Sequence, residues 1–291
     1  MNKEMTLSQA CAQIESGMTI GIGGWGPRRK PMALVRELVR SDVRDLTVVA
    51  YGGPEVGMLC AAGKVKKLVF GFVTMDAIPL EPFYRKAREA GELELMELDE
   101  GMLEWGLRAA GMRLPYLPTR CGLASDVLAK CPALKTVASP YDDGEVLLAM
   151  PALTLDVALL HVNDADRWGN TLITGRDAYF DHLFARAAEC TLVSCERLTD
   201  KFALSAEEAR ANLFERYLVS GVVHAPGGAH PTLNNPDYGW DLAHMKAYVA
   251  AAAEEGGWAA YRARHIDGGE AAYRAQNGLP TRLAELSHPI F

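Results

Sequence analysis

The sequence has 291 residues, of which 49% are hydrophobic and 23% charged, with a formal net charge of −7. This length allows one large α/β domain or two small ones, and the composition excludes disordered and fibrous classes. The negative charge offers no broad basic surface for a phosphate backbone, so we expect no nucleic-acid partner. The sequence contains no apolar run of the roughly 18 residues that cross a bilayer, and its start lacks a secretory signal. We therefore expect a cytoplasmic protein without a membrane partner.

In chain order, short apolar strands alternate with amphipathic helices. The pattern predicts helices over residues 6–14, 32–39, 56–62, 82–90 and 102–112, and strands over 18–22, 46–50, 67–72, 93–98, 157–162 and 191–194. Strands separated by helices of about ten residues are typical of βαβ units. The fold class is therefore α/β, with an open, mainly parallel sheet and flanking helices.

The last part of the chain has a different composition. Residues 241–291 are rich in alanine, glutamate and aromatic residues, and glycines divide this segment into helical pieces. We expect residues 1–240 to form the α/β domain, and the helical extension to pack on that domain or on a partner.

Cysteine and histidine spacing gives no sign of a metal site. The six cysteines form no CxxC pair and are interpreted as small buried side chains. Of the seven histidines, only His224 and His230 lie close together, and this pair lacks a third ligand. We expect no metal.

A glycine-rich segment, GIGGWGPRRKP over residues 21–31, follows a predicted strand and precedes a predicted helix. Glycines there allow close approach of a ligand to the backbone, and the helix start offers free N–H donors to an anion. The spacing matches neither GxGxxG nor a Walker loop, so a dinucleotide or nucleoside triphosphate is not indicated. The alternative interpretation is a tight turn with a solvated basic cluster.

This segment resembles the α-subunit signature of the family I coenzyme A transferases. Gly23-Gly24-Trp25 matches its Gly-Gly-aromatic step and Pro31 its proline, whereas Ser16, Trp25 itself and Arg29 replace the usual residues. A second stretch, residues 150–170, resembles the family's apolar strand followed by an aspartate and Gly-Asn. Its matching residues are Asp166, Gly169 and Asn170.

The resemblance implies a coenzyme A transferase fold and an α-type subunit. The family's catalytic glutamate lies in a Ser-Glu-Asn-Gly motif of the β subunit, and this motif is absent here. We therefore expect a β subunit of the same family as partner, in an αβ or α2β2 assembly. Details of the chain are similar to one branch, the α subunit of the hydrolase that opens the last ring in bacterial steroid breakdown. That branch implies an acyl-coenzyme A thioester substrate and no separate cofactor.

Acidic residues cluster where a predicted strand meets a predicted helix, in ELDEGM over residues 97–102. One interpretation is an acidic first turn that complements the helix dipole. In the resembled hydrolase branch the catalytic glutamate lies in this segment, which implies Glu100 as general base. Asp99 and Glu104 remain alternatives.

Other candidates concern the binding of substrate and coenzyme A. The backbone N–H groups of Gly23, Gly24 and Trp25 are candidates to stabilise an oxyanion. Arg28 and Arg29 are candidates for the coenzyme A phosphates and Arg120, in a predicted loop, for a substrate carboxylate. Solvated charge and a structural ion pair are the alternatives.

The leading functional hypothesis is a ring-opening hydrolase subunit. A glutaconate-type coenzyme A transferase α subunit is the alternative. An effector-binding module of a transcription regulator is disfavoured, because the chain has a negative charge and no basic helix-turn-helix segment.

Overall fold

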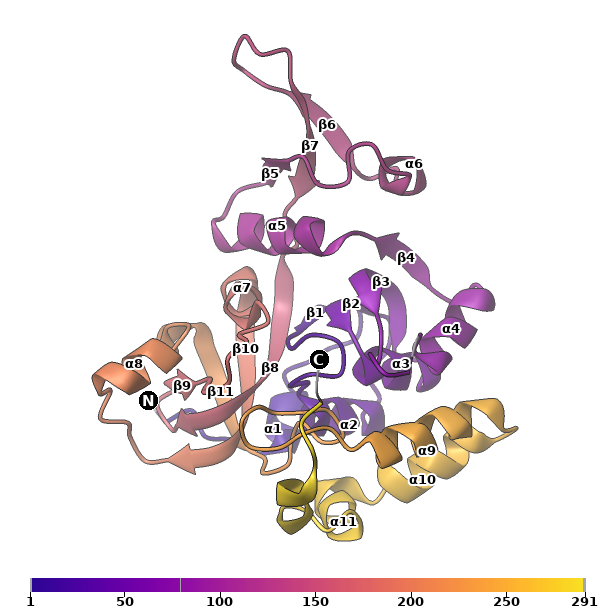
Figure 1. Ribbon diagram of the computed structural model, residues 1–291, viewed down its shortest axis with the longest axis vertical. Coiled ribbons are helices and arrows are strands. Elements are labelled where there is room, and N and C mark those ends of the chain that lie inside the picture. Colours follow the sequence, from indigo (N-terminus) through magenta and orange to yellow (C-terminus); the bar gives the residue numbers. More distant parts are fainter. Residues whose placement is uncertain (1, 79, 290–291) are drawn as a thin grey trace.

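The computed structural model describes residues 2–78 and 80–289, and its centre is an eight-stranded sheet (Figure 1). The sheet order is β11-β10-β8-β1-β2-β3-β4, every neighbouring pair on this path is parallel, and β9 pairs antiparallel with β8. The strands are β1 (Thr19–Ile22), β2 (Leu46–Gly52), β3 (Val65–Val73), β4 (Glu94–Glu97), β8 (Leu155–Asp166), β9 (Thr171–Leu172), β10 (Ala188–Thr199) and β11 (Val219–His224). The expected α/β class with a mainly parallel sheet is confirmed.

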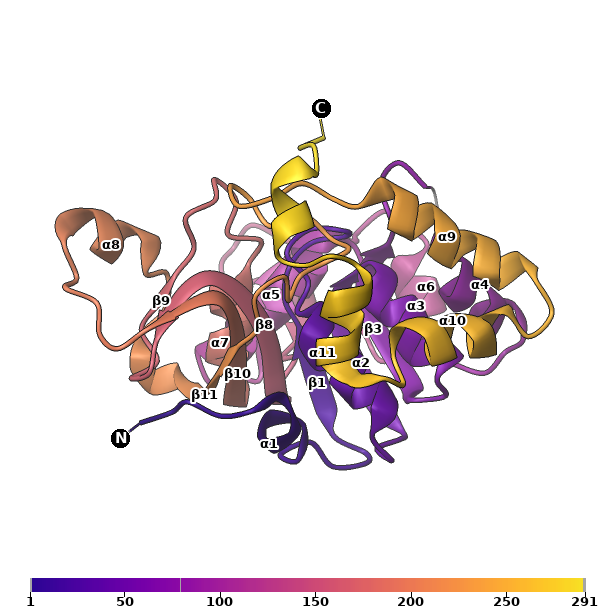
Figure 2. The same cartoon turned by 90° about the horizontal axis from the view of Figure 1, so that it is seen from below.

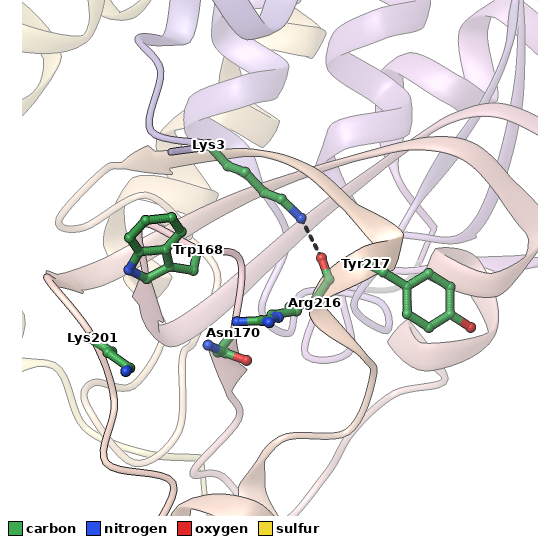
Figure 3. Close-up of a pocket in the computed structure, with 6 residues that line it drawn as sticks. All are labelled: Lys3, Trp168, Asn170, Lys201, Arg216 and Tyr217. Atoms are coloured by element: carbon green, nitrogen blue, oxygen red, sulfur yellow. Dashed lines mark hydrogen bonds between the residues drawn. The ribbon is translucent and has the colours of Figure 1, made fainter. Parts of the chain in front are cut away.

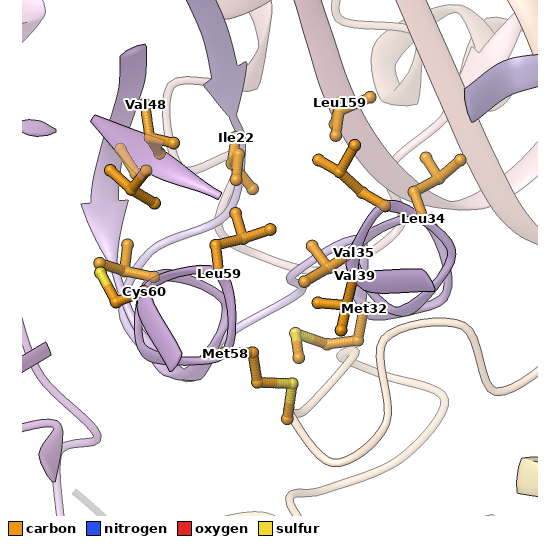
Figure 4. Close-up of a cluster of buried hydrophobic side chains, with 14 of the residues drawn as sticks. Ile22, Met32, Leu34, Val35, Val39, Val48, Met58, Leu59, Cys60 and Leu159 are labelled. Carbon is orange, nitrogen blue, oxygen red and sulfur yellow. The ribbon is translucent and has the colours of Figure 1, made fainter. Parts of the chain in front are cut away.

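Helices cover both faces of this sheet, and each face has its own buried apolar cluster. The helices of one face are α1 (Leu7–Cys11), α2 (Met32–Arg40), α3 (Pro54–Ala61) and α4 (Pro82–Glu89); those of the other are α5 (Glu100–Gly111) and α7 (Asp181–Ala187). Figure 4 shows Val35 of α2 and Leu59 of α3 directed toward Ile22 and Val48 of the sheet. Burial of these apolar side chains holds the layers together.

The C-terminal helices pack back on the same chain (Figure 2). They are α9 (Leu242–Ala253), α10 (Gly257–His265) and α11 (Gly269–Gln276). Arg36 of α2 forms an ion pair with Glu270 of α11 at 2.6 Å, and Tyr248 of α9 donates a hydrogen bond to Glu81 at 2.7 Å. The extension therefore covers α2 and α4 of its own α/β domain.

A second, three-stranded antiparallel sheet projects from the body beyond α5 (Figure 1). It contains β5 (Tyr116–Thr119), β6 (Lys135–Ala138) and β7 (Val146–Pro151), in the order β5-β7-β6, and the short helix α6 (Val127–Lys130) lies between β5 and β6. The expected loop around Arg120 is thus wrong in part, because residues 116–119 are a strand and Arg120 follows it. These strands are short and largely exposed, so they lack the apolar runs that revealed the main sheet.

The remaining elements are α8 (Ala206–Ala211), η1 (Arg216–Leu218) and η2 (Thr281–Glu285). Within the described ranges, every helix is too short or too polar to span a membrane.

Candidate active site

Glu100 lies at the carboxyl edge of the parallel sheet, where open α/β sheets bind their ligands. It is the first residue of α5, directly after the short link that follows β4. Its side chain is exposed, and its carboxylate makes no hydrogen bond or ion pair with residues 2–78 and 80–289. This carboxylate is therefore free to accept a proton from a bound water or substrate.

The neighbouring acidic residues have structural partners. Asp99 is the N-cap of α5, and its side chain accepts a hydrogen bond from the N–H of Met102 at 2.6 Å. Glu104 forms an ion pair with Arg108 at 2.5 Å, one helical turn on. Asp99 thus supports the start of the helix, as one interpretation of the acidic cluster expected. Of Asp99, Glu100 and Glu104, Glu100 is the strongest candidate for the general base.

Two contacts hold the first turn of α5 in place. The buried Tyr51 hydroxyl, from the end of β2, donates a 2.9 Å hydrogen bond to the main-chain carbonyl of Glu100. Gly71 of β3 lies so close that a Cβ atom at its position would stand 3.3 Å from the Cα atom of Glu100. Glu100 is therefore fixed directly on the ends of β2 and β3.

The glycine-rich turn closes on its own chain, which contradicts the expected oxyanion site. The backbone N–H groups of Gly23, Gly24 and Trp25 all donate hydrogen bonds inside the protein. Their acceptors are the Leu159 carbonyl at 2.9 Å, the Asp181 carboxylate at 2.8 Å and the Arg28 carbonyl at 3.0 Å. Because each donor is already used, this turn offers none of the three to a substrate oxyanion.

Arg29 also differs from its expected role. Its side chain is only 2% exposed and lies 3.1 Å from the fully buried Asp181 carboxylate, so it does not present its charge to coenzyme A phosphates at the surface. Burial raises the pKa of Asp181, and the nearby Arg29 charge opposes that rise. The pair connects the glycine-rich turn to the start of α7.

A second buried ion pair lies beneath the turn and was not anticipated from the sequence. Lys30 contacts Glu55 at 2.8 Å with both side chains fully buried, and its ammonium donates to the Tyr51 carbonyl at 2.6 Å. Burial lowers the pKa of Lys30 and raises that of Glu55, while their mutual attraction opposes both shifts. The basic run of the sequence thus serves in part to fix the turn on β2 and α3.

The other two candidate arginines remain near the surface. Arg28 pairs with Asp76 at 2.6 Å and lies over the Trp25 ring, with 4.8 Å from its guanidinium carbon to the ring centroid. Arg120 pairs with Glu145 of the projecting sheet and is 77% exposed. The exposed Arg120 pair contributes about 0–1 kcal/mol, so Arg120 can exchange its partner for a ligand anion. The Arg28–Asp76 pair is mostly buried, with side chains 18% and 15% exposed, and is held more firmly.

The second family-like stretch forms a structural turn at the end of β8. Both carboxylate oxygens of Asp166 are engaged: one accepts the N–H groups of Trp168 and Asn170, and the other accepts the Asn170 side-chain amide at 2.7 Å. Asp166 therefore holds the turn in place, and both of its carboxylate oxygens are used in doing so.

Beside this turn lies a cavity of about 490 Å³ (Figure 3). Its lining residues are Lys3, Trp168, Asn170, Lys201, Arg216 and Tyr217. The Lys3 ammonium donates to two main-chain carbonyls, those of Arg216 at 2.5 Å and Val219 at 2.7 Å. This cavity does not include Glu100.

Three buried side chains, His230, Asp241 and His244, bring possible metal-ligand atoms within 4.8 Å of one another. Spacing along the chain pointed instead to His224 and His230. Asp241 already contacts His230 at 3.1 Å and Arg282 at 2.8 Å, through the same carboxylate oxygen. The contacts of Asp241 with His230 and with the Arg282 guanidinium are enough to stabilise these side chains in the interior without a metal. The absence of a metal stays a prediction.

A buried Ser–His–Glu arrangement joins β8 and β10. His161 contacts Ser194 at 2.8 Å through one ring nitrogen and Glu196 at 2.8 Å through the other. Burial would raise the pKa of Glu196, but hydrogen bonds from His161, Tyr238 and Gly227 hold it below its usual value. His161 and Ser194 are fully buried, so the arrangement resembles a catalytic triad but has no access for a substrate.

The fold and the site define an α/β protein that presents the exposed Glu100 carboxylate at the carboxyl edge of its parallel sheet. The family model described as "Coenzyme A transferase" matches residues 4–225. The chain belongs to this coenzyme A transferase family.

Two curated relatives are both described as the IpdA subunit of a cholesterol ring-cleaving hydrolase. The chain is 50% identical to the Rhodococcus jostii protein, covering 92% of this chain and 93% of that one. It is 49% identical to the protein of Mycobacterium tuberculosis strain CDC 1551, covering 94% and 96%. Among solved structures, glutaconate coenzyme A-transferase from Acidaminococcus fermentans is similar with a TM-score of 0.89 and 29% identity, covering 98% of this chain and 95% of that chain.

Proposed function

We propose that this chain is the α-type subunit of an enzyme that opens a steroid-derived ring in an acyl-coenzyme A thioester by adding water. The observation that carries the proposal is the 50% identity, over nearly the whole of both chains, to a ring-cleaving hydrolase subunit. The Glu100 carboxylate, which has no partner among the described residues, supplies a group able to act as general base.

In the proposed reaction Glu100 takes one proton from a water molecule, and the resulting hydroxide adds to a ring carbonyl carbon. Collapse of the tetrahedral alkoxide breaks the adjacent carbon–carbon bond, whose electron pair leaves as an enolate. Protonation of that carbon, by the proton held on Glu100, gives a new carboxyl group and an open chain. Atoms and charge balance without a further cofactor, and coenzyme A enters only as part of the substrate.

The proposal includes a partner subunit, because the relatives are described as subunits. We propose a β-type chain of the same family, in an αβ or α2β2 complex in the cytoplasm, where twofold doubling gives a closed symmetric assembly. Co-expression followed by size-exclusion chromatography checks the assembly. This chain expressed alone is expected to be inactive, which a turnover assay checks.

The test is turnover of a cyclic enone acyl-coenzyme A thioester by the co-purified complex in ¹⁸O-water. One ¹⁸O atom in the new carboxyl group, with coenzyme A still attached to the product, supports the hydrolase. Release of free coenzyme A with an intact ring contradicts it.

The second candidate is a dicarboxylate coenzyme A transferase subunit, favoured by the likeness to glutaconate coenzyme A-transferase at a TM-score of 0.89. A transferase of this family passes through a glutamyl–coenzyme A thioester on its β subunit. Hydroxylamine or borohydride traps that thioester, whereas the proposed hydrolase forms none. Trapping after incubation with acyl-coenzyme A therefore separates the two candidates.

A further inference from the structure

Aromatic rings from four separate segments meet beside Glu100. Trp25 follows β1, Tyr51 lies near the end of β2, Phe72 lies in β3 and Phe180 precedes α7. Ring centroids are 4.8 Å apart for Trp25 and Phe72, 5.9 Å for Tyr51 and Phe72, and 5.2 Å for Tyr51 and Phe180. Tyr51 is fully buried, whereas the other three rings keep exposed surface. We call Trp25, Phe72 and Phe180 the aromatic wall.

An irregularity in the sheet places Phe72 in this wall. Ala50 of β2 pairs with Phe70 of β3, but Gly52 pairs with Val73, so β3 has one extra residue opposite Tyr51. Such a bulge redirects side chains locally and is common beside active sites. Here Phe72 lies against Tyr51, while Gly71 leaves room for the first turn of α5.

Phe180 is held in the wall against its backbone preference. Both Tyr179 and Phe180 adopt the left-handed region, with φ of 50° and 65°, which is unfavourable for bulky residues. Asp181, the next residue, is fixed by the N–H of Gly24 and by Arg29. Strain of this kind persists where surrounding contacts determine the conformation, and it concentrates at ligand sites.

The wall and the candidate base form one unit, because Tyr51 touches both. Its ring packs against Phe72 and Phe180, and its hydroxyl holds the Glu100 main chain. A group resting on the wall is therefore next to the segment that carries the Glu100 carboxylate. At Trp25, the guanidinium of Arg28, which pairs with Asp76, lies over the ring.

We propose that the aromatic wall binds the carbocycle of the acyl group and selects ring-bearing thioesters over linear ones. The inference rests on the proposed function and deepens it by assigning specificity to Trp25, Phe72 and Phe180. Half-buried aromatic faces stabilise an apolar ring by burying its surface, and a ring loses less conformational freedom on binding than an open chain. A linear dicarboxylate offers no such surface.

The experiment compares two unreactive probes with the same number of acyl carbons, cyclohexanecarbonyl-coenzyme A and heptanoyl-coenzyme A, by calorimetric titration of the assembled complex. Trp25→Leu and Phe72→Leu should each weaken binding of the cyclic probe about tenfold and that of the linear probe less than about threefold. Trp25→Phe should give an intermediate loss for the cyclic probe.

Matched controls lie on the other face of the sheet. Trp258 and Phe83 pack against each other there, with ring centroids 5.4 Å apart, so Trp258→Leu and Phe83→Leu remove similar aromatic surface far from Glu100. Both control variants should bind the two probes as the wild type does. Thermal unfolding identifies any variant that fails to fold, and Trp25→Phe then carries the test.

Equal losses for the two probes, or unchanged binding of the cyclic probe by the folded wall variants, would overturn the inference. Turnover of the cyclic enone thioester by the wild-type complex tests the proposed function separately. Selective loss of cyclic binding without any ring opening would support the wall and contradict the hydrolase. Ring opening by the wild type, with equal loss of both probes in the wall variants, would support the hydrolase and contradict the wall.

Discussion

The Tyr51 hydroxyl donates a 2.9 Å hydrogen bond to the main-chain carbonyl of Glu100, joining residues 49 positions apart. Tyr51 is fully buried at the end of β2, whereas the Glu100 side chain is exposed at the start of α5. A rigid, buried residue thus positions an exposed carboxylate through the backbone. This arrangement leaves the carboxylate itself without a hydrogen-bond or ion-pair partner among residues 2–78 and 80–289.

Replacing Tyr51 by phenylalanine should reduce turnover while leaving substrate binding nearly unchanged. The ring stays in place, but the lost hydrogen bond lets the first turn of α5 shift, and misplacement of a catalytic group by about 1 Å costs up to 10²-fold in rate. We expect a kcat lowered about tenfold or more and a stability loss of about 0.5–1.5 kcal/mol. Steady-state kinetics and denaturant unfolding measure the two effects.

The matched control for this variant is Tyr84→Phe. Tyr84 is also buried and its hydroxyl accepts a 2.9 Å hydrogen bond from Arg88, but it lies on the other face of the sheet. Its removal should cost similar stability and leave kcat unchanged. Equal loss of kcat in both variants would mean that the Tyr51 contact serves the fold alone.

Glu100→Gln should leave the complex assembled and able to bind the thioester, because it keeps the shape of the side chain. Turnover should fall by about 10²–10⁴-fold, the usual contribution of general acid–base catalysis. Asp99→Ala should instead lower stability by about 0.5–2 kcal/mol through loss of the helix cap. Kinetics and melting temperature on the same samples separate these effects, and wild-type turnover by Glu100→Gln would move the base to Asp99, Glu104 or the partner chain.

Gly24 should tolerate no side chain, because the backbone of its own turn lies too close. Its φ is +75°, and a Cβ atom there would lie 2.4 Å from the Arg28 carbonyl oxygen. Gly63 is the control, because its φ is +65° but a Cβ atom there would have no atom of the described residues within 4 Å. Gly63→Ala should cost about 1–2 kcal/mol from the left-handed backbone alone, and Gly24→Ala clearly more. Similar unfolding free energies for the two variants would contradict the close packing of the turn.

Glu81 should make stability fall as the pH rises toward neutrality. Burial raises its pKa from 4.5 to about 7, although hydrogen bonds from Tyr248 and Tyr84 oppose that rise. Between these two values the folded protein binds more protons than the unfolded chain. The stability that Glu81 contributes is therefore present below about pH 4.5 and is lost as the pH rises through 7.

The measurement is the unfolding free energy of wild type and Glu81→Gln from pH 4.5 to 8. Glutamine can accept the Tyr84 N–H through its oxygen and donate to the Tyr248 hydroxyl through its nitrogen. It does not ionise, so the variant should gain stability relative to wild type as the pH rises. A constant difference between the two proteins would show that Glu81 ionises with equal ease in both states. Taking the difference also removes the contribution of His244, whose pKa is lowered by burial to about 3 and which acts in the opposite direction.

The periodic parts of this fold could be predicted from the sequence. Strands β1 and β2 and the middle of β3 are buried and mostly apolar, as is usual in parallel sheets, and this pattern is local. The junction carrying Glu100 was also recognisable, since a strand signal, an acidic cap and a helix signal follow one another. Local patterns of this kind depend only on neighbouring residues.

Only the tertiary structure decided how the polar groups are used. Asp181 lies 157 residues after Gly24, yet its carboxylate takes the N–H that the sequence suggested for a substrate. The aromatic wall likewise joins three distant segments, and the bulge that directs Phe72 into it depends on the pairing of β2 with β3. Which partner a hydrogen-bond donor or an aromatic ring meets depends on which strands become neighbours. That depends on residues far apart in the chain, so no local sequence pattern predicts it.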